Sequence, residues 1–395
     1  MLKTTNLFQI IVSIFIILVI SSCATWKASK VMDVTYSTQK SFKSTVKFNR
    51  PLKLIVIPVV INGKSYNFLW DTGAISVISE DLKNELNLKK KFSSGVKDSA
   101  GKSNKLEYVQ VPQITISGIE FNNVGVAVTN AVKSKTLSCL NIEGIVGGNL
   151  MKAAIWELKL NDNELNFASH IDSFDIKENS FPVGFKIGNF GTPYVDLFVD
   201  TNKFSKLTFD SGYSGFVSIS KSNFKDTSFT SIATKHLGYN SSGLYGQNHS
   251  LQYSIPMRAS IDSLHGNTDV VSISNTKKKK LVGVEFMEGY DLIINWNTKM
   301  IHLTPLPIEQ KALSYRTIIP KYLENKLVLG TIEMNSNTQN LKISDKIDFL
   351  NGKNTQDFTI QDYCHFINNV EDTPDSLLIE LENGKQVWST KKSFD

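Results

Sequence analysis

Two aspartates of this 395-residue chain stand in the same local context, and that context suits acid–base chemistry. Asp71 begins Asp-Thr-Gly-Ala, and Asp210 begins Asp-Ser-Gly-Tyr-Ser-Gly. Two carboxyl groups held a few Å apart cannot both ionise easily, so they share one proton. The charged member can then act as a general base on a water molecule while the protonated member donates a hydrogen bond. This chemistry needs neither a metal nor a covalent intermediate.

The residues that follow each aspartate also have roles in such a site. Thr72 and Ser211 each put a hydroxyl group next to a carboxylate. Gly73 and Gly212 allow the backbone to approach the carboxylates closely. A single Asp-Thr/Ser-Gly is more often a turn or a helix cap, so the prediction depends on finding the whole arrangement twice.

Both aspartates follow a predicted β-hairpin. Residues 54–61 and 66–70 read as strands around the turn Asn62-Gly63, which is a strong hairpin signal. Residues 194–199 and 207–209 repeat this order around a turn at 200–202. Each aspartate is therefore expected at the end of a return strand.

A second pair of landmarks follows the aspartates. Ile145-Val146-Gly147 matches Leu281-Val282-Gly283 at an offset of 136 positions, and the aspartates are offset by 139. An internal repeat of this kind indicates a duplicated unit. The sequence predicts two β-rich lobes, at 48–168 and 169–310, and one chain is sufficient to supply both aspartates.

These motifs resemble those of the pepsin/retropepsin-like aspartic peptidases. The resemblance implies a mainly β fold with two duplicated acid-protease-like β-barrel lobes that form one cleft. It also implies that Asp71 and Asp210 are catalytic, that Thr72 and Ser211 tie the two loops together, and that the substrate is a peptide or protein, with no cofactor. Tyr213 departs from the family, in which a small residue is frequent at its position. A non-catalytic, peptide-binding protein with the same fold stays open as the alternative.

The family closes its cleft with a hairpin called the flap. Residues 95–104 have the polar, Gly-bearing composition of an exposed hairpin tip. Tyr108 is expected to pack below it as a strand residue, and residues 114–124 read as a strand, a turn and a strand. In the second lobe, residues 239–253 predict a second flap or a loop over the cleft.

The C-terminal residues 315–392 predict a small α+β domain. Residues 343–353 resemble a segment of bacterial PDZ domains of the circularly permuted kind, with Ser344 in place of a glycine. A strand at 327–332, a helix at 359–369 and a closing hairpin at 377–388 fit that order. No carboxylate-binding loop of the PDZ type is present, so peptide binding by this domain stays open, as does an unrelated α+β appendage.

The N-terminal segment predicts export and a lipid anchor. Residues 7–20 are almost unbroken apolar sequence of signal-peptide length. The following Ile20-Ser21-Ser22-Cys23 resembles a bacterial lipobox, which implies a signal peptide at 1–22 and lipid attachment to Cys23. A plain signal peptide is the alternative. Residues 23–47 are predicted to be a tether, and the protein is expected at the outer membrane, facing the periplasm.

Composition excludes several other classes. The net charge is +6, but the basic residues are scattered. Lys277 to Lys280 form one dense run, which we interpret as a solvated turn and not as a nucleic-acid site. Cys139 and Cys364 are predicted to be buried, unpaired thiols, with a bridge between them as the minority alternative. The six histidines lack metal-ligand spacing, so no metal site is expected.

Overall fold

The computed structural model describes residues 30–97, 103–134, 137–243, 246–261, 266–276, 279–307 and 312–394. Strands make up 51% and helices 15%, which confirms the predicted mainly β class. The predicted signal peptide and Cys23 lie outside the described residues. Within these ranges, no helix combines the length and the apolar character that crossing a bilayer requires.

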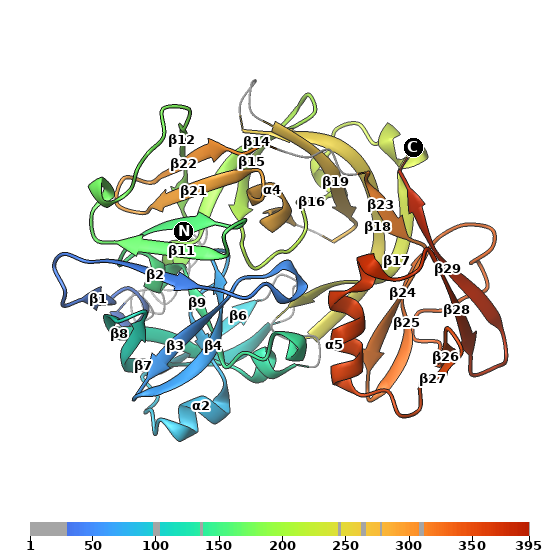
Figure 1. Ribbon diagram of the computed structural model, residues 1–395, viewed down its shortest axis with the longest axis horizontal. Helices are drawn as coiled ribbons and strands as arrows, with labels where there is room; N and C mark the ends of the chain where they lie inside the picture. The colour runs from blue at the N-terminus through green and yellow to red at the C-terminus, as the bar shows by residue number, and fades with distance from the viewer. Residues whose placement is uncertain are drawn as a thin grey trace, which may run out of the picture.

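Residues 48–168, called lobe 1 below, contribute most of an eight-stranded sheet (Figure 1). The strand that leads to Asp71 lies in its interior, between an antiparallel and a parallel neighbour. In sheet order the strands are β1 (Tyr36–Ser37), β8 (Ile119–Val128), β5 (Val77–Ile78), β9 (Gly144–Gly147), β4 (Lys64–Asp71), β3 (Val56–Ile61), β7 (Ser103–Ile116) and β6 (Phe92–Lys97).

Residues 169–310, called lobe 2, form most of a ten-stranded sheet that continues into the C-terminal residues. Its sheet order is β13 (Lys186–Ile187), β14 (Pro193–Val199), β15 (Asn202–Phe209), β20 (Lys280–Val282), β16 (Val217–Ser220), β19 (Gly266–Ser274), β18 (Gly246–Ser260), β17 (Thr234–Gly243), β25 (Lys326–Glu333) and β24 (Ile318–Leu323).

Both lobes contribute to a third, six-stranded sheet. Its order is β12 (Phe181–Gly184), β22 (Met300–Pro305), β21 (Tyr290–Asn295), β10 (Ile155–Lys159), β11 (Glu164–Ala168) and β2 (Lys43–Lys47). In its centre Trp156 pairs with Ile294, and Leu158 pairs with Leu292. Adding the repeat offset of 136 to positions 156 and 158 gives 292 and 294. The repeat therefore maps each of these two pairs onto the other, and the two lobes meet with matching register.

The hairpins that precede the aspartates form where they are predicted. Asn62 and Gly63 both have positive φ, at 50° and 78°. Two consecutive residues with positive φ form a type I′ turn, whose twist matches that of the flanking strands β3 and β4. Asp200 has a φ of 50° at the matching turn between β14 and β15. Asn and Asp tolerate this conformation better than most residues with a side chain.

One hydrophobic core joins the two lobes, while the C-terminal residues have their own. The shared core contains Trp70 and Trp156, both fully buried, with ring centres 6.1 Å apart. Trp156 also stacks on Phe167 at 4.8 Å. These large side chains from β4, β10 and β11 bind the eight-stranded sheet to the six-stranded sheet directly below Asp71.

The prediction that residues 23–47 form a tether is wrong for the part that includes Met32, β1 and β2. Strand β2 pairs with β11 over five residues, and β1 pairs with β8. Met32 is fully buried in the shared core. Side-chain burial alternates along β2, with Val46 buried and Lys43 and Lys47 exposed. Its polar composition is therefore that of an edge strand and not of a tether. Strand β12 occupies the opposite edge of the same sheet.

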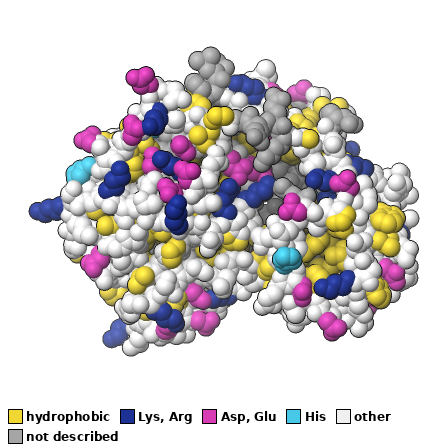
Figure 2. Space-filling model, viewed as in Figure 1, with side chains coloured by type: hydrophobic (Ala, Val, Ile, Leu, Met, Phe, Trp, Pro, Cys, Tyr) yellow, Lys and Arg dark blue, Asp and Glu magenta, His cyan; other side chains and the backbone are white. Residues whose placement is uncertain are grey.

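Residues 314–393, called the C-terminal module, lie at one side of the lobes and are coloured red in Figure 1. Besides β24 and β25, their strands are β23 (Ser314–Arg316), β26 (Ile347–Leu350), β27 (Lys353–Asn354), β28 (Ser376–Leu381) and β29 (Gln386–Ser393). Helix α5 (Ile360–Asn368) begins at the capping box of Thr359 and Asp362 and faces the lobes. Figure 2 shows hydrophobic side chains gathered over this module.

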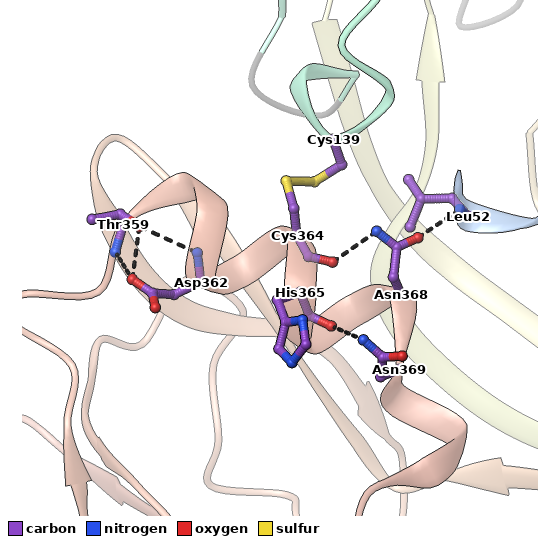
Figure 3. The surroundings of a disulfide bond; sticks show 8 residues. All are labelled: Leu52, Cys139, Thr359, Asp362, Cys364, His365, Asn368 and Asn369. Atoms are coloured by element: carbon purple, nitrogen blue, oxygen red, sulfur yellow. Dashed lines mark hydrogen bonds between the residues drawn. A yellow bond between two sulfur atoms is a disulfide. The ribbon is translucent and has the colours of Figure 1, made fainter. Parts of the chain in front are cut away.

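The expectation of two unpaired cysteines is wrong, because Cys139 and Cys364 form a disulfide across 225 positions of sequence. Cys139 lies in the 3₁₀ helix η3 (Ser138–Leu140) of lobe 1, and Cys364 lies in α5. Beside the disulfide, the backbone N–H of Leu52 donates to Asn368 Oδ1 at 2.7 Å (Figure 3). The fold therefore brings together two cysteines that are too far apart in sequence for a disulfide to have been predicted.

Candidate active site

The two Asp-Thr/Ser-Gly segments emerge side by side from the interiors of their sheets. Asp71 ends β4 and lies opposite Gly147 of β9 in a parallel pair. Asp210 follows β15, and its N–H donates to Val282 O of β20 at 2.8 Å. The apolar-apolar-Gly segments thus flank the aspartate strands and hold the start of each loop.

Four hydrogen bonds tie the loops to each other, and they match in pairs. The Thr72 N–H donates to Ser211 Oγ and the Ser211 N–H donates to Thr72 Oγ1, each at 3.0 Å. The Thr72 hydroxyl donates to Phe209 O at 2.5 Å, and the Ser211 hydroxyl donates to Trp70 O at 2.9 Å. Both side chains are fully buried. This network fixes the separation of the loops, because each hydroxyl both donates and accepts.

Each glycine faces the carboxyl group of the opposite loop. A Cβ atom added to Gly73 would lie 2.5 Å from the Asp210 carboxyl carbon, and one added to Gly212 would lie 2.3 Å from Asp71 Oδ2. Each glycine also donates its N–H to the aspartate two residues before it, at 2.8 Å for Asp71 and 3.0 Å for Asp210. Only glycine fits these positions, since any side chain would enter the space of a carboxylate.

The two carboxyl groups behave electrostatically as one unit. Burial raises the pKa of Asp71, while a hydrogen bond with Asp210 and backbone N–H donors oppose that rise. Burial, the charge of Asp71 and their shared hydrogen bond together raise the pKa of Asp210 well above its usual range. The pair therefore retains one proton at a pH at which separate aspartates would have lost theirs.

Asn149 supports the first loop, although no sequence pattern singles it out. Its side chain accepts from Ser76 N at 2.7 Å and donates to Met32 O and Gly125 O. It lies in the short helix α3 (Gly148–Met151), and the matching helix α4 (Val284–Met287) has Glu285 at the position 136 residues later. Glu285 forms a 2.9 Å ion pair with Lys53.

Two long hairpins follow the aspartates in the predicted order. Strands β6 and β7 pair from Phe92–Tyr108 to Lys97–Ser103, and the rest of the predicted tip lies outside the described residues. Tyr108 is a buried strand residue stacked on Phe92, with ring centres 4.4 Å apart. In lobe 2, β17 and β18 pair from Thr234–Ser254 to Gly243–Gly246. The strand-turn-strand predicted at 114–124 forms from β7 and β8.

Lys279, which lies against the Asp210 loop, was not predicted to belong to the site. The run from Lys277 was predicted to be a solvated turn, yet Lys279 is half-buried, and its ammonium lies 5.7 Å from the centre of the Tyr213 ring. Its positive charge opposes the rise in the pKa of Asp210.

In the described part of the chain, no group of three or more His, Cys, Asp or Glu side chains could hold a metal ion.

Comparison with known proteins bears on the first loop. Residues 57–150 match a family model described as Aspartyl protease. The match runs from β3 to α3, so it contains Asp71, Thr72 and Gly73 together with the apolar-apolar-Gly segment at 145–147. No curated protein matches the chain. The match supports an aspartyl protease family for this part of the chain and suggests a peptidase hydrolase.

Proposed function

We propose that this protein is an aspartic endopeptidase in which Asp71 and Asp210 activate one water molecule. The observation that carries the proposal is the pairing of the two Asp-Thr/Ser-Gly loops, in which each glycine faces the opposite carboxyl group and the hydroxyls of Thr72 and Ser211 lock the loops together. The matching register of β10 and β21 supports two lobes that arose by duplication.

The proposed reaction uses the single proton of the pair. The ionised carboxylate removes a proton from water, which attacks the peptide carbonyl carbon, while the protonated carboxyl donates to the carbonyl oxygen. The resulting tetrahedral diol returns one hydroxyl proton to the dyad as its C–N bond breaks, and the amine leaving group takes a proton from the dyad. The pair ends with one proton, as it began, so no external acid or metal is consumed.

Cleavage of a peptide library by the chain lacking residues 1–23 tests this proposal. We expect Asp71→Asn and Asp210→Asn each to lower kcat by at least about 10³-fold, because either change removes the shared proton or its acceptor. Asp196→Asn is the matched control, since Asp196 is an exposed residue that pairs with Lys203 at 3.5 Å and should leave turnover unchanged. Cleavage that survives either dyad substitution would exclude the dyad.

The alternative is a peptide-binding protein that keeps the fold without turnover. Tyr213, where the family frequently has a small residue, favours this reading. The peptide-library assay distinguishes the peptidase from the peptide-binding protein, because the binding protein should bind peptides without cleaving them from acid to neutral pH.

We also propose that the protein is a lipoprotein, attached through Cys23 at the outer membrane and facing the periplasm. The disulfide between Cys139 and Cys364 supports an exported protein, since disulfides persist in oxidising compartments such as the periplasm. Replacing Cys23 by alanine should abolish incorporation of labelled palmitate and release the protein from membranes. Retention of the label would contradict the assignment.

We propose further that the C-terminal module is PDZ-like. Ser344, which replaces the glycine of the PDZ segment, has a φ of 75°, and the following Asn351-Gly352 turn has φ values of 50° and 79°. A positive φ at Ser344 is the conformation that a glycine would adopt readily. Ser344→Gly relieves this backbone strain but removes the Oγ that lies 2.8 Å from the Tyr239 hydroxyl, so the two effects should nearly cancel and thermal unfolding should show little net change in stability.

A further inference from the structure

Lys279 is a cation whose side chain lies over the Tyr213 ring of the Asp210 loop and whose charge acts on Asp210. Its backbone is held firmly, because its N–H donates to Ser220 Oγ and its carbonyl accepts from the Ser220 N–H at 2.7 Å. Its side chain is half-buried over the ring of Tyr213. Among the residues that the structure describes, no carboxylate forms an ion pair with its ammonium.

Tyr213 connects this lysine to the Asp210 loop. The Tyr213 N–H donates to Asp210 O at 3.2 Å, and its carbonyl accepts from Val284 N at 2.8 Å. Its hydroxyl lies against Gly215, where an added Cβ would be 2.5 Å away. The ring is thus a fixed surface beside the dyad, and the ammonium above it cannot move far without losing its cation–π contact.

The charged groups around Lys279 leave its positive charge only partly balanced. Asp210 attracts it, and burial lowers the pKa of Lys279. Glu285, the other carboxylate near Tyr213, is already paired with Lys53 at 2.9 Å. The dyad holds one proton, so its single negative charge is shared by Asp71 and Asp210. A peptide that covered the dyad would remove water from the ammonium and increase the cost of leaving it unpaired.

We propose that Lys279 is a specificity-determining residue whose ammonium pairs with a carboxylate of the bound peptide, so that substrates carrying Asp or Glu beside the scissile bond are preferred. This inference rests on the proposed peptidase function and adds a substrate class to it. A desolvated, charge-assisted hydrogen bond gives a preference that a surface charge could not, because solvent screens an exposed pair.

The test compares peptides that differ only in Glu or Gln on either side of the scissile bond, at pH 6, where Glu is ionised. We expect the wild-type chain lacking residues 1–23 to favour the Glu peptide by about tenfold in kcat/KM. Lys279→Met should reduce that ratio to about one, and Lys279→Arg should keep most of it. Lys279→Glu should reverse it in favour of peptides with lysine at that position.

Lys280→Met is the matched control, because it removes the same charge one residue away. Lys280 Nζ donates to Ser205 O at 3.2 Å, so the Glu preference should persist in this variant. An unchanged Glu/Gln ratio in Lys279→Met, or an equal loss in Lys280→Met, would overturn the inference.

Affinity separates this inference from the proposed function. The dissociation constants of the Glu and Gln peptides are measured for Asp71→Asn, with and without Lys279→Met. A Glu preference that disappears with Lys279 sustains the subsite even if no peptide is ever cleaved by the wild type. Equal affinities for the two peptides would remove the subsite even if cleavage is observed.

Discussion

The two hairpins that follow the aspartates have the same place in their lobes but different neighbours. Strand β6 of lobe 1 is the last strand of its sheet, and among the described strands it pairs with β7 alone. Strand β17 of lobe 2 pairs with β18 on one side and with β25 of the C-terminal module on the other, through Leu237–Ile332 and its two neighbouring pairs. In the described part of the chain, one lobe thus has a hairpin edge without a partner strand, while the other lobe uses the same edge to dock a further module.

Side chains strengthen this docking. The Tyr239 hydroxyl and Ser344 Oγ lie 2.8 Å apart, and the Lys321 ammonium lies 5.4 Å from the Tyr239 ring. The disulfide then fastens the same module to lobe 1. The C-terminal module is therefore attached to both lobes, and among the described residues it pairs with the hairpin of lobe 2 and not with that of lobe 1.

The aspartate loops, in contrast, are alike, and breaking either should have the largest effect. Gly73→Ala and Gly212→Ala should each lower kcat/KM by at least about 10³-fold, because the new Cβ would displace the opposite carboxyl group. Peptide hydrolysis measures the loss, and circular dichroism checks that the variants fold. A large difference between the two variants would contradict the equivalence of the loops.

Removing the disulfide should affect the hairpin of lobe 2 and not the hairpin of lobe 1. Replacing both Cys139 and Cys364 by serine should lower the free energy of unfolding by about 2–4 kcal/mol. Hydrogen exchange should speed up in α5 and β17, which depend on the docked module, and stay constant in β6. Equal acceleration in β6 and β17 would show that the module restrains both hairpins.

Acid should weaken the docked hairpin selectively. His236 of β17 is buried opposite Glu333, beside the Tyr315 ring at 5.4 Å, and burial lowers its pKa to about 4. The unfolded chain therefore binds a proton more readily between pH 6.5 and pH 4, so stability is lost as the pH falls through that window. The loss amounts to up to about 3 kcal/mol.

Unfolding free energies measured across this range for the wild type and His236→Gln check the effect. The variant should lose the part of the pH dependence that lies between pH 6.5 and pH 4. Lys392, which pairs with Glu333 at 3.0 Å, stays charged throughout and does not contribute. Identical pH curves for the two proteins would exclude His236 as the cause.

The smallest expected effect concerns one contact of the docking. Tyr239→Phe removes the hydroxyl that meets Ser344 but keeps the ring under Lys321. We expect a loss of about 1 kcal/mol and slightly faster hydrogen exchange in β17. Tyr108→Phe in the lobe 1 hairpin is the matched control for removing a hydroxyl from a strand tyrosine, and it should leave β17 exchange unchanged.

Much of the architecture is encoded in local patterns. The dense β-branched run before Asn62-Gly63 predicts β3, β4 and the turn between them, because turn chemistry and alternation act over a few residues. The aspartate loops and the apolar-apolar-Gly segments could be located for the same reason, and repetition linked them across the chain. The helix at 359–369 was predicted from its short amphipathic pattern, which also acts over a few residues.

Other features depend on residues that are distant in sequence. The pairing of Cys139 with Cys364, the insertion of residues 43–47 as an edge strand and the docking of β25 on β17 each require a partner more than 90 positions away. Lys279 looked like part of a solvated run, and only packing against Tyr213 places it at the site. Local sequence patterns identify the residues that could do the chemistry, whereas the surroundings of those residues follow from the tertiary structure, because burial and charge pairing arise only when separate segments meet.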